Sequence, residues 1–202
     1  MYLDQYNKGS FTLGAPYWKV FLWYAIGSPL IQNHLLDGLK TGRNLKVLVL
    51  RWFGASVGQG VLIKPGVKIK LPWRLHIGNH VWIGQDAWLD NAAEIYIEDN
   101  VCISQGAYLC TGNHDWSDPT FRLKLGAIRI ECSSWIGAKA VVGPGITIGR
   151  GAVLSLGSVT GKSLQPMTIY AGNPAIAIKQ RSLTHIPSIE QLENVSSEKN
   201  MF

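Results

Sequence analysis

An aliphatic residue recurs at every sixth position over much of the chain, which has 202 residues. The six-residue count shifts by two places after Leu75 and again after Ile95, and it resumes each time. Small or β-branched residues recur four places after the aliphatic one, and glycine often adjoins one of the two. The sixteen aliphatic positions are Val57, Ile63, Ile69, Leu75, Ile77, Ile83, Leu89, Ile95, Ile97, Ile103, Leu109, Ile130, Ile136, Val142, Ile148 and Leu154.

This six-residue repeat predicts a parallel β-helix over residues 55–165. Six residues make one short strand and a corner, and three such units close a triangular coil. The aliphatic side chains then point inward, and glycine allows the tight corners. No helix-length segments separate the strands, which excludes an ordinary parallel sheet of βαβ units. We therefore expect an all-β core of stacked coils, with a two-residue insert at one corner of each of the first two.

Two apolar segments before the repeat predict helices. Residues 17–29 read as an aromatic helix ended by Gly27 and Pro29, and residues 33–52 as a second helix that Gly54 ends. The expected apolar face of the second helix comprises Leu35, Leu36, Leu39, Leu45, Leu48 and Val49.

The predicted division of the chain has three parts. Residues 1–54 form an N-terminal arm and helices, residues 55–165 the β-helix, and residues 166–202 a C-terminal cap with a polar tail. The tail from Ser182 onward is expected to be poorly ordered because it is polar.

Charge is concentrated in the first part of the chain. Residues 1–76 hold ten Lys and Arg against two acidic residues, a net +8, whereas residues 77–202 hold nine against eleven, a net −2. The basic part suits an anionic membrane, an anionic polymer or a phosphorylated cofactor, or is simply a solvated surface. Nucleic acid is not expected, because no recognised binding module accompanies the charge.

The aromatic segment 17–29 is too short to span a bilayer, which needs about 20 apolar residues. Its two Trp and two Tyr residues are the types favoured at a membrane–water interface. It could therefore lie on the cytoplasmic membrane face, or pack on the end of the β-helix or on a neighbouring subunit.

The cysteines and the first residues bear on location. The three cysteines are odd in number and lack CxxC spacing, and residues 1–10 are polar, so a cytoplasmic location is expected.

The repeat breaks once, at His114. Residues 115–129 follow no six-residue count, and the rhythm resumes at Ile130. A histidine at the single break indicates a scaffold with one extruded loop that carries chemistry.

With the break Thr111-Gly112-Asn113-His114 and the ending Tyr170-Ala171-Gly172-Asn173-Pro174-Ala175 in view, the chain resembles the hexapeptide-repeat acyltransferases. It looks closest to the maltose and galactoside O-acetyltransferase branch. Within that branch it is similar to the colanic-acid biosynthesis O-acetyltransferases, through segments 64–69, 104–105 and 109–115. The resemblance implies a left-handed coil, a homotrimer with active sites in the clefts between neighbouring coils, acetyl-CoA as co-substrate and no metal.

The same resemblance assigns roles to particular residues. His114 would be the general base that takes a proton from an acceptor hydroxyl, a task that imidazole suits because it ionises near neutral pH. A backbone N–H of segment 135–138 would stabilise the oxyanion. No nucleophile elbow is present, so direct transfer without an acyl-enzyme is expected. The implied acetyl-CoA contacts are Trp135, Ala138, Leu156, Gly161, Lys162 and Lys179.

Asn91, Asp115 and Trp116 are the candidates for acceptor binding. Asn91 matches an acceptor-binding asparagine of the sugar acetyltransferases. Asp115 would touch an acceptor hydroxyl or orient His114. Trp116, together with Trp88 and Phe121, would stack on a sugar ring or pack the loop.

The favoured interpretation is acetyl transfer to a sugar hydroxyl in exopolysaccharide or lipid-linked glycan synthesis. Three alternatives stay open at this point. One is an acetyltransferase for a small molecule such as an antibiotic or a free sugar. Another is a non-catalytic scaffold. The third is a zinc hydratase, which needs three converging histidines, for which His76, His80 and His114 are the candidates in the coil region.

Overall fold

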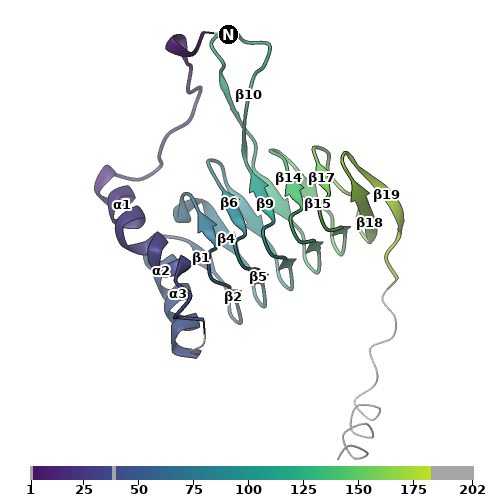
Figure 1. Ribbon diagram of the computed structural model, residues 1–202, viewed down its shortest axis with the longest axis horizontal. Helices are drawn as coiled ribbons and strands as arrows, with labels where there is room; N and C mark the ends of the chain where they lie inside the picture. Colours follow the sequence, from purple (N-terminus) through teal and green to yellow (C-terminus); the bar gives the residue numbers. More distant parts are fainter. Residues whose placement is uncertain (1, 38–39, 183–202) are drawn as a thin grey trace, which may run out of the picture.

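The computed structural model describes residues 2–37 and 40–182. It shows a long triangular prism of parallel β-strands, with helices packed at one end and a hairpin extruded from the middle (Figure 1). The expected left-handed parallel β-helix is confirmed. The predicted polar tail lies outside the described residues from residue 183 onward.

Three sheets form the faces of the prism, here called faces A, B and C. Face A comprises β1 (Ser56–Val57), β4 (Leu75–Ile77), β7 (Ile95–Ile97), β12 (Ile128–Ile130) and β15 (Thr147–Ile148). Face B comprises β2 (Leu62–Ile63), β5 (Trp82–Ile83), β8 (Cys102–Ile103), β13 (Trp135–Ile136), β16 (Val153–Leu154), β18 (Thr168–Gly172) and β19 (Ala175–Gln180). Face C comprises β3 (Lys68–Ile69), β6 (Trp88–Asp90), β9 (Tyr108–Cys110), β14 (Val141–Val142) and β17 (Val159–Thr160).

All sixteen aliphatic residues of the repeat point into the prism, and none is more than 8% exposed. They stack in register from coil to coil: faces B and C each contribute one ladder to the core, and face A contributes a second one with Leu75, Ile95 and Ile128. On face B, for example, Ile63, Ile83, Ile103, Ile136 and Leu154 follow one another. Each ladder buries apolar surface between residues of adjacent coils. The stability of the prism therefore comes from the contacts between neighbouring coils.

The structure revises the bounds of the extruded loop. The excursion is an antiparallel hairpin of β10 (Gly112–His114) and β11 (Leu123–Leu125), and the Gly126 N–H closes its base on the Thr111 carbonyl at 2.9 Å. Ile128, expected in the loop, is buried and pairs with Ile95. The strand after the loop is longer than the repeat predicts, because it must match the three-residue strand β7.

The N-terminal helices also differ from the expectation. One helical stretch runs through α1 (Tyr17–Leu22), a π-helical turn (Trp23–Gly27) and α2 (Ser28–Gln32), so neither Gly27 nor Pro29 ends it. Pro29 lies in the first turn of α2, where a missing N–H costs little. A Cβ at Gly27 would overlap the rings of Trp23 and Phe53, so Gly27 permits close packing.

The second helix, α3 (Lys40–Trp52), is shorter than predicted and turned differently. Leu45 and Leu48 face outward, while Lys46 and Leu50 are fully buried. The Lys46 ammonium donates to the Ile63 carbonyl at 3.3 Å, and burial lowers its pKa. Val49 packs against the core as expected, so the amphipathic pattern identified the helix but was wrong about Leu45 and Leu48; Leu39 lies outside the described residues.

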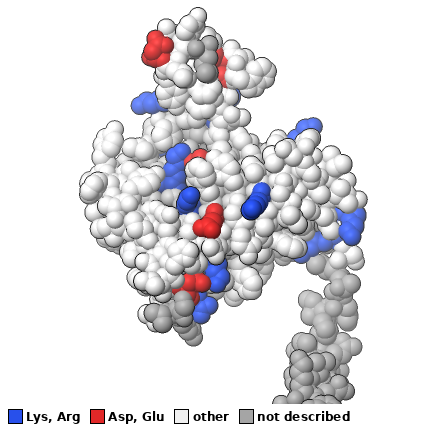
Figure 2. All heavy atoms as spheres, viewed as in Figure 1, with Lys and Arg blue, Asp and Glu red and all other residues white. Residues whose placement is uncertain are grey.

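The outward faces of these helices expose large apolar side chains, which we together call the aromatic surface: Tyr17, Trp18, Phe21, Leu48 and Trp52. Trp18, Phe21 and Trp52 are 65%, 70% and 72% exposed. The part of the molecule over α1 and α2 is almost free of charged side chains in the view of Figure 2, at the left. In the part of the chain that the structure describes, no helix is long and apolar enough to cross a membrane.

Two corner glycines allow a test of what sets the stability of the coil. A Cβ at Gly84 would lie 2.6 Å from the backbone N of Gln105 on the next coil, whereas one at Gly157 would meet nothing within 4 Å but has φ +65°. We expect Gly84→Ala to cost about 3 kcal/mol through overpacking and Gly157→Ala about 1 kcal/mol through its backbone conformation. Urea unfolding at one protein concentration measures both. Equal losses would contradict this view of coil stacking.

Candidate active site

His114 ends the first strand of the hairpin, directly beyond face C. The chain leaves the coil at Thr111, which is fully buried. Its hydroxyl donates to the Asp90 carbonyl and accepts from the Ala93 N–H, both at 2.9 Å. The base of the hairpin is therefore held on the preceding coil, and His114 is three residues beyond that anchor.

The His114 imidazole is oriented by Phe121 on the returning side of the hairpin. Nδ1 lies 2.9 Å from the Phe121 carbonyl oxygen, and the two rings stack with centroids 3.9 Å apart and planes at 5°. Because a carbonyl only accepts, Nδ1 carries the proton and Nε2 holds the lone pair. Among the described residues Nε2 has no hydrogen-bond partner. The geometry thus presents a base with its free nitrogen available.

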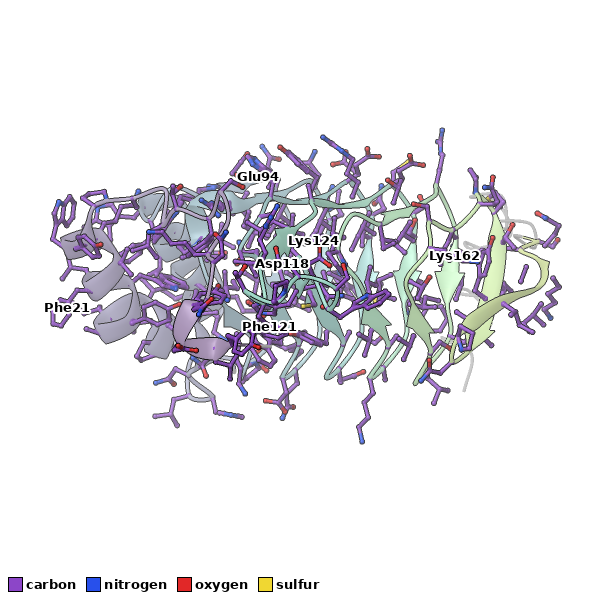
Figure 3. All side chains as sticks on the ribbon, turned by 90° about the horizontal axis from the view of Figure 1, so that it is seen from above. Phe21, Glu94, Asp118, Phe121, Lys124 and Lys162 are labelled. Atoms are coloured by element: carbon purple, nitrogen blue, oxygen red, sulfur yellow. The ribbon has the colours of Figure 1, made fainter. Side chains whose placement is uncertain are left out.

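Asp115 does not orient His114. Its carboxylate lies 2.8 Å from the Lys124 ammonium and accepts hydrogen bonds from the N–H and hydroxyl of Ser117. Lys124 and Ser117 together hold the pKa of this carboxyl well below its usual range. A second pair, Asp118 with Arg122 at 3.0 Å, lies in the same hairpin. Figure 3 shows Asp118, Phe121 and Lys124 gathered over the middle of the prism.

The other two acceptor candidates lie apart from His114 within one chain. Trp116 is at the hairpin tip and 91% exposed. Asn91 is fully buried in the corner insert, where its Oδ1 accepts from the N–H groups of Lys70 and Leu71 and its Nδ2 donates to the Leu71 carbonyl. The Asn91 amide therefore closes the corner and has no polar atom directed to solvent.

Face C carries an aromatic hollow on the N-terminal side of the hairpin. Trp88 stacks on Tyr108 with centroids 4.7 Å apart, and the Tyr108 hydroxyl lies 3.2 Å from Asp90, which pairs with Lys70 at 2.8 Å. Trp88, Asp90 and Lys70, with Tyr24 from the helices, line a hollow of about 370 Å³.

Three of the six predicted cofactor residues gather at one corner, between faces B and C. Ala138 and Leu156 occupy successive coils there, and the Ala138 carbonyl accepts from the Gly157 N–H at 2.8 Å. Trp135, half exposed on β13, donates its indole N–H to the Ser104 hydroxyl at 2.8 Å. In segment 135–138 the N–H groups of Trp135 and Gly137 bond to the next coil, whereas that of Ala138 has no partner among the described residues.

The other three lie elsewhere. Gly161 and Lys162 follow β17, at the corner of face C from which the hairpin also leaves, and both are exposed. Lys179 is on β19 at the C-terminal end of the prism. Within one chain, His114 and the Ala138 corner therefore lie at opposite edges of face C, and the predicted residues do not form one continuous patch.

The residue that the sequence did not reveal is Tyr6. Its ring lies 5.9 Å from that of His114, at an interplanar angle of 57°. No local pattern could indicate it, because the contact joins two segments that are distant in sequence and neither follows the repeat. Phe121, considered as a sugar-stacking residue, instead packs on the histidine.

Residues 2–37 and 40–182 hold no group of three His, Cys, Asp or Glu placed to bind a metal ion. His76, one of the three histidines required for a zinc hydratase, pairs with Glu94 at 3.0 Å and stacks on Tyr96. His114 is turned toward Phe121 instead.

A β-helix of six-residue repeats with one extruded hairpin that carries a histidine is the architecture of the hexapeptide-repeat transferases. No family model matches the chain. It is 40% identical to the colanic acid biosynthesis acetyltransferase WcaF of Escherichia coli K12 over 163 residues, which are 81% of this chain and 87% of the relative. The chain therefore belongs to the hexapeptide-repeat acetyltransferase family, in the group of the colanic acid biosynthesis acetyltransferases.

More distant relatives agree with this assignment. The galactoside O-acetyltransferase of E. coli K12 is 27% identical over 129 residues, 62% of this chain and 64% of that protein. The fold is similar to the crystal structure of a hexapeptide-repeat acetyltransferase from Vibrio cholerae O1 biovar eltor, complexed with acetyl coenzyme A. That likeness has a TM-score of 0.74 at 21% identity and covers 90% of this chain and 98% of the other.

The hydrogen bond from His114 predicts its neutral tautomer. We expect the Nδ1–H form, because the Phe121 carbonyl can only accept. Nitrogen chemical shifts of ¹⁵N-histidine-labelled protein at alkaline pH report the tautomer, and His114→Ala identifies the resonance. An Nε2–H tautomer at His114 would contradict the proposed orientation of the base.

Proposed function

We propose that this protein transfers the acetyl group of acetyl-CoA to a sugar hydroxyl in the synthesis of an exopolysaccharide or a lipid-linked glycan. The observation that carries the proposal is the His114 imidazole, held by Phe121 with Nε2 free, on the excursion of an acetyltransferase β-helix. The 40% identical relative is named for colanic acid biosynthesis, which supports a glycan acceptor. A distant relative that acetylates galactosides supports a sugar hydroxyl.

In the proposed reaction, Nε2 of His114 takes the proton of the acceptor hydroxyl as its oxygen attacks the thioester carbonyl. The C–O bond forms, and the tetrahedral oxyanion collapses with loss of the CoA thiolate. The proton on His114 then passes to the leaving sulfur, so the products are the acetyl ester and CoA thiol. The Phe121 carbonyl stabilises the transient imidazolium through its hydrogen bond to Nδ1.

The Ala138 N–H is our candidate for the oxyanion donor, because it has no partner among the described residues while Trp135 and Gly137 use theirs in the coil. Acetyl-CoA would then extend past Leu156 and Trp135, and Lys162 or Lys179 would meet its phosphates. Both lysines are exposed and available for this contact. We leave Asn91 out of the acceptor site, since its amide is committed to the backbone.

A homotrimer would bring the two halves of this site together. His114 and Ala138 lie at opposite edges of face C, so a cleft between two chains can combine one edge from each. The outward side chains support such packing. Those of face B include Trp82 and Trp135, and those of face C include Trp88 and Val141, whereas face A presents the polar ladder Ser56, His76, Tyr96, Arg129 and Thr147. Two apolar faces per chain suit a closed ring in which each chain uses two different surfaces.

The aromatic surface would contact the cytoplasmic face of an anionic membrane. Residues 15–54 contain five Lys and Arg but only one acidic residue, Asp37, and with the buried Lys46 left out their net charge is +3. Exposed aromatic rings next to such a charge suit the interface of an anionic bilayer. A lipid-linked acceptor would be held at that same surface.

Replacement of the base tests the reaction. We expect His114→Ala to lower the rate of CoA release by ~10²–10⁴ and leave acetyl-CoA binding nearly unchanged. The measurement is thiol release from acetyl-CoA with methyl glycosides of glucose, galactose, mannose and fucose, maltose, and a polyprenyl-diphosphate-linked hexose.

His34→Ala is the matched control, because His34 is exposed and lies outside the β-helix. A His114→Ala variant as active as the parent would disprove the mechanism. Preference for chloramphenicol over every sugar in the panel would favour the small-molecule interpretation instead. Tight acetyl-CoA binding without transfer to any acceptor would favour a non-catalytic role.

The membrane contact is tested by Phe21→Ser combined with Trp52→Ser. We expect co-sedimentation with phosphatidylglycerol-containing vesicles to weaken by about tenfold or more, because two interfacial rings are lost. Ile176→Ser is the control, since Ile176 is 63% exposed on β19 at the other end of the prism. Light scattering on the same samples gives the mass of the protein assembly. A variant that binds vesicles as the parent does but no longer forms the oligomer would assign the aromatic surface to a subunit contact.

A further inference from the structure

The N-terminal arm, residues 2–15, is docked on the hairpin that carries His114. The Tyr2 N–H donates to the Pro119 carbonyl at 2.8 Å and the Asn7 N–H to the Thr120 carbonyl at 3.0 Å. The Leu123 N–H donates back to the Asn7 carbonyl at 3.0 Å. In Figure 1 the arm runs from α1 along the outside of the prism to the hairpin. Three backbone hydrogen bonds thus attach it to the loop that forms the site.

A second set of contacts holds the other end of the arm. The Trp73 indole N–H donates to the Leu13 carbonyl at 2.7 Å, and the Arg74 guanidinium donates to the Thr12 carbonyl at 2.5 Å. Both residues belong to the short 3₁₀ helix Pro72–Arg74 in the first corner insert. The arm therefore spans from the first coil to the hairpin with both ends fixed, and its course is determined.

Gly9 shows that this docking is close. Its φ is +57°, and a Cβ there would lie 2.8 Å from the Leu123 carbonyl oxygen of the hairpin. Glycine is needed for both the backbone conformation and the short approach. The backbone of the arm therefore packs in direct contact with the hairpin at Gly9.

Tyr6 lies between the two hairpin contacts of the arm and directs its ring to His114, with centroids 5.9 Å apart. The ring is tilted by 57° to the imidazole, in contrast to the parallel stack of Phe121. The side chain is 46% exposed, and its hydroxyl has no hydrogen-bond partner among the residues that the structure describes. An aromatic ring with a free hydroxyl is thus presented beside the proposed base.

The direction of the arm places Tyr6 on the side of His114 from which the acceptor would approach. The arm comes from the helical end of the prism, whereas Ala138, Leu156 and Lys162 belong to coils after the hairpin (Figure 1). Figure 3 shows the same order along the prism, with Phe21 at one end, Phe121 in the middle and Lys162 beyond it. If acetyl-CoA occupies the later coils, the acceptor must approach His114 from the side of the arm.

We infer that Tyr6 is a sugar-binding residue of the acceptor site, delivered to His114 by the docked N-terminal arm. This inference rests on the proposed function. The ring offers an apolar surface for one face of a pyranose, and the hydroxyl is a hydrogen-bond partner for a sugar oxygen. The hollow at Trp88 lies on the same side and would extend the contact to a second sugar unit.

The kinetic test compares Tyr6→Ala and Tyr6→Phe with the parent, on the best acceptor of the glycoside panel. We expect Tyr6→Ala to raise the KM for the acceptor by about tenfold or more, with the KM for acetyl-CoA unchanged. Tyr6→Phe keeps the ring and should retain most of the parent's affinity for the acceptor. Tyr2→Ala is the control, since its side chain is 59% exposed and only its backbone N–H bonds to the hairpin. Equal changes in both KM values, or none, would overturn the inference.

A second measurement does not depend on any acceptor. Tyr6→Leu removes a ring current 5.9 Å from His114, so the ring-proton shifts of His114 should change while those of His34 and His76 stay in place. No change at His114 would overturn the docked arm. A change at His114 together with failure of transfer to every acceptor would refute the proposed function but leave the placement of Tyr6 standing.

Discussion

Coil closure is the constraint on which the rest of this structure depends. A coil of 18 or 20 residues has room inside for the ladders of aliphatic side chains, the small residues near its corners and little else. Ile103, for example, is enclosed between Ile83 and Ile136 in the neighbouring coils. Such a core has no interior space for a ligand, so any chemistry must lie on the outer faces, at the corners or in an excursion.

The extruded hairpin must therefore be stabilised by contacts outside the apolar core. A two-stranded hairpin is marginal alone, and this one extends beyond the apolar core that stabilises the coils. Its stability comes from ion pairs of Asp115 and Asp118, from the stack of Phe121 on His114 and from the backbone of the N-terminal arm. Phe121 also fixes the tautomer of the histidine through its carbonyl oxygen, so a residue that orders the hairpin also orients the proposed base.

Placement of the remaining residues follows from the triangular section. Corners recur at fixed intervals along the chain, so the corners at Ala138 and Leu156 align on successive coils. The hairpin leaves from the other edge of face C, which separates the base from the Ala138 corner by the width of a face. Within one chain the two stay apart, and the neighbouring chain of the proposed homotrimer would supply the missing wall.

The sequence alone determined the β-helix and its sixteen inward residues, because they follow a local period that the geometry of the coil requires. The two corner inserts and the single histidine-bearing break were equally visible, because they interrupt that period. Tertiary structure decided the rest. Leu48, expected in the core, faces outward, while Lys46 is buried against the first coil, because packing on that coil and not helix amphipathicity sets the rotation of α3. Asn91 became a structural residue through hydrogen bonds to the preceding coil, and Tyr6 reached His114 through an arm with no periodic pattern. Contacts between segments far apart in sequence leave no such period, and they appear only once the chain is folded.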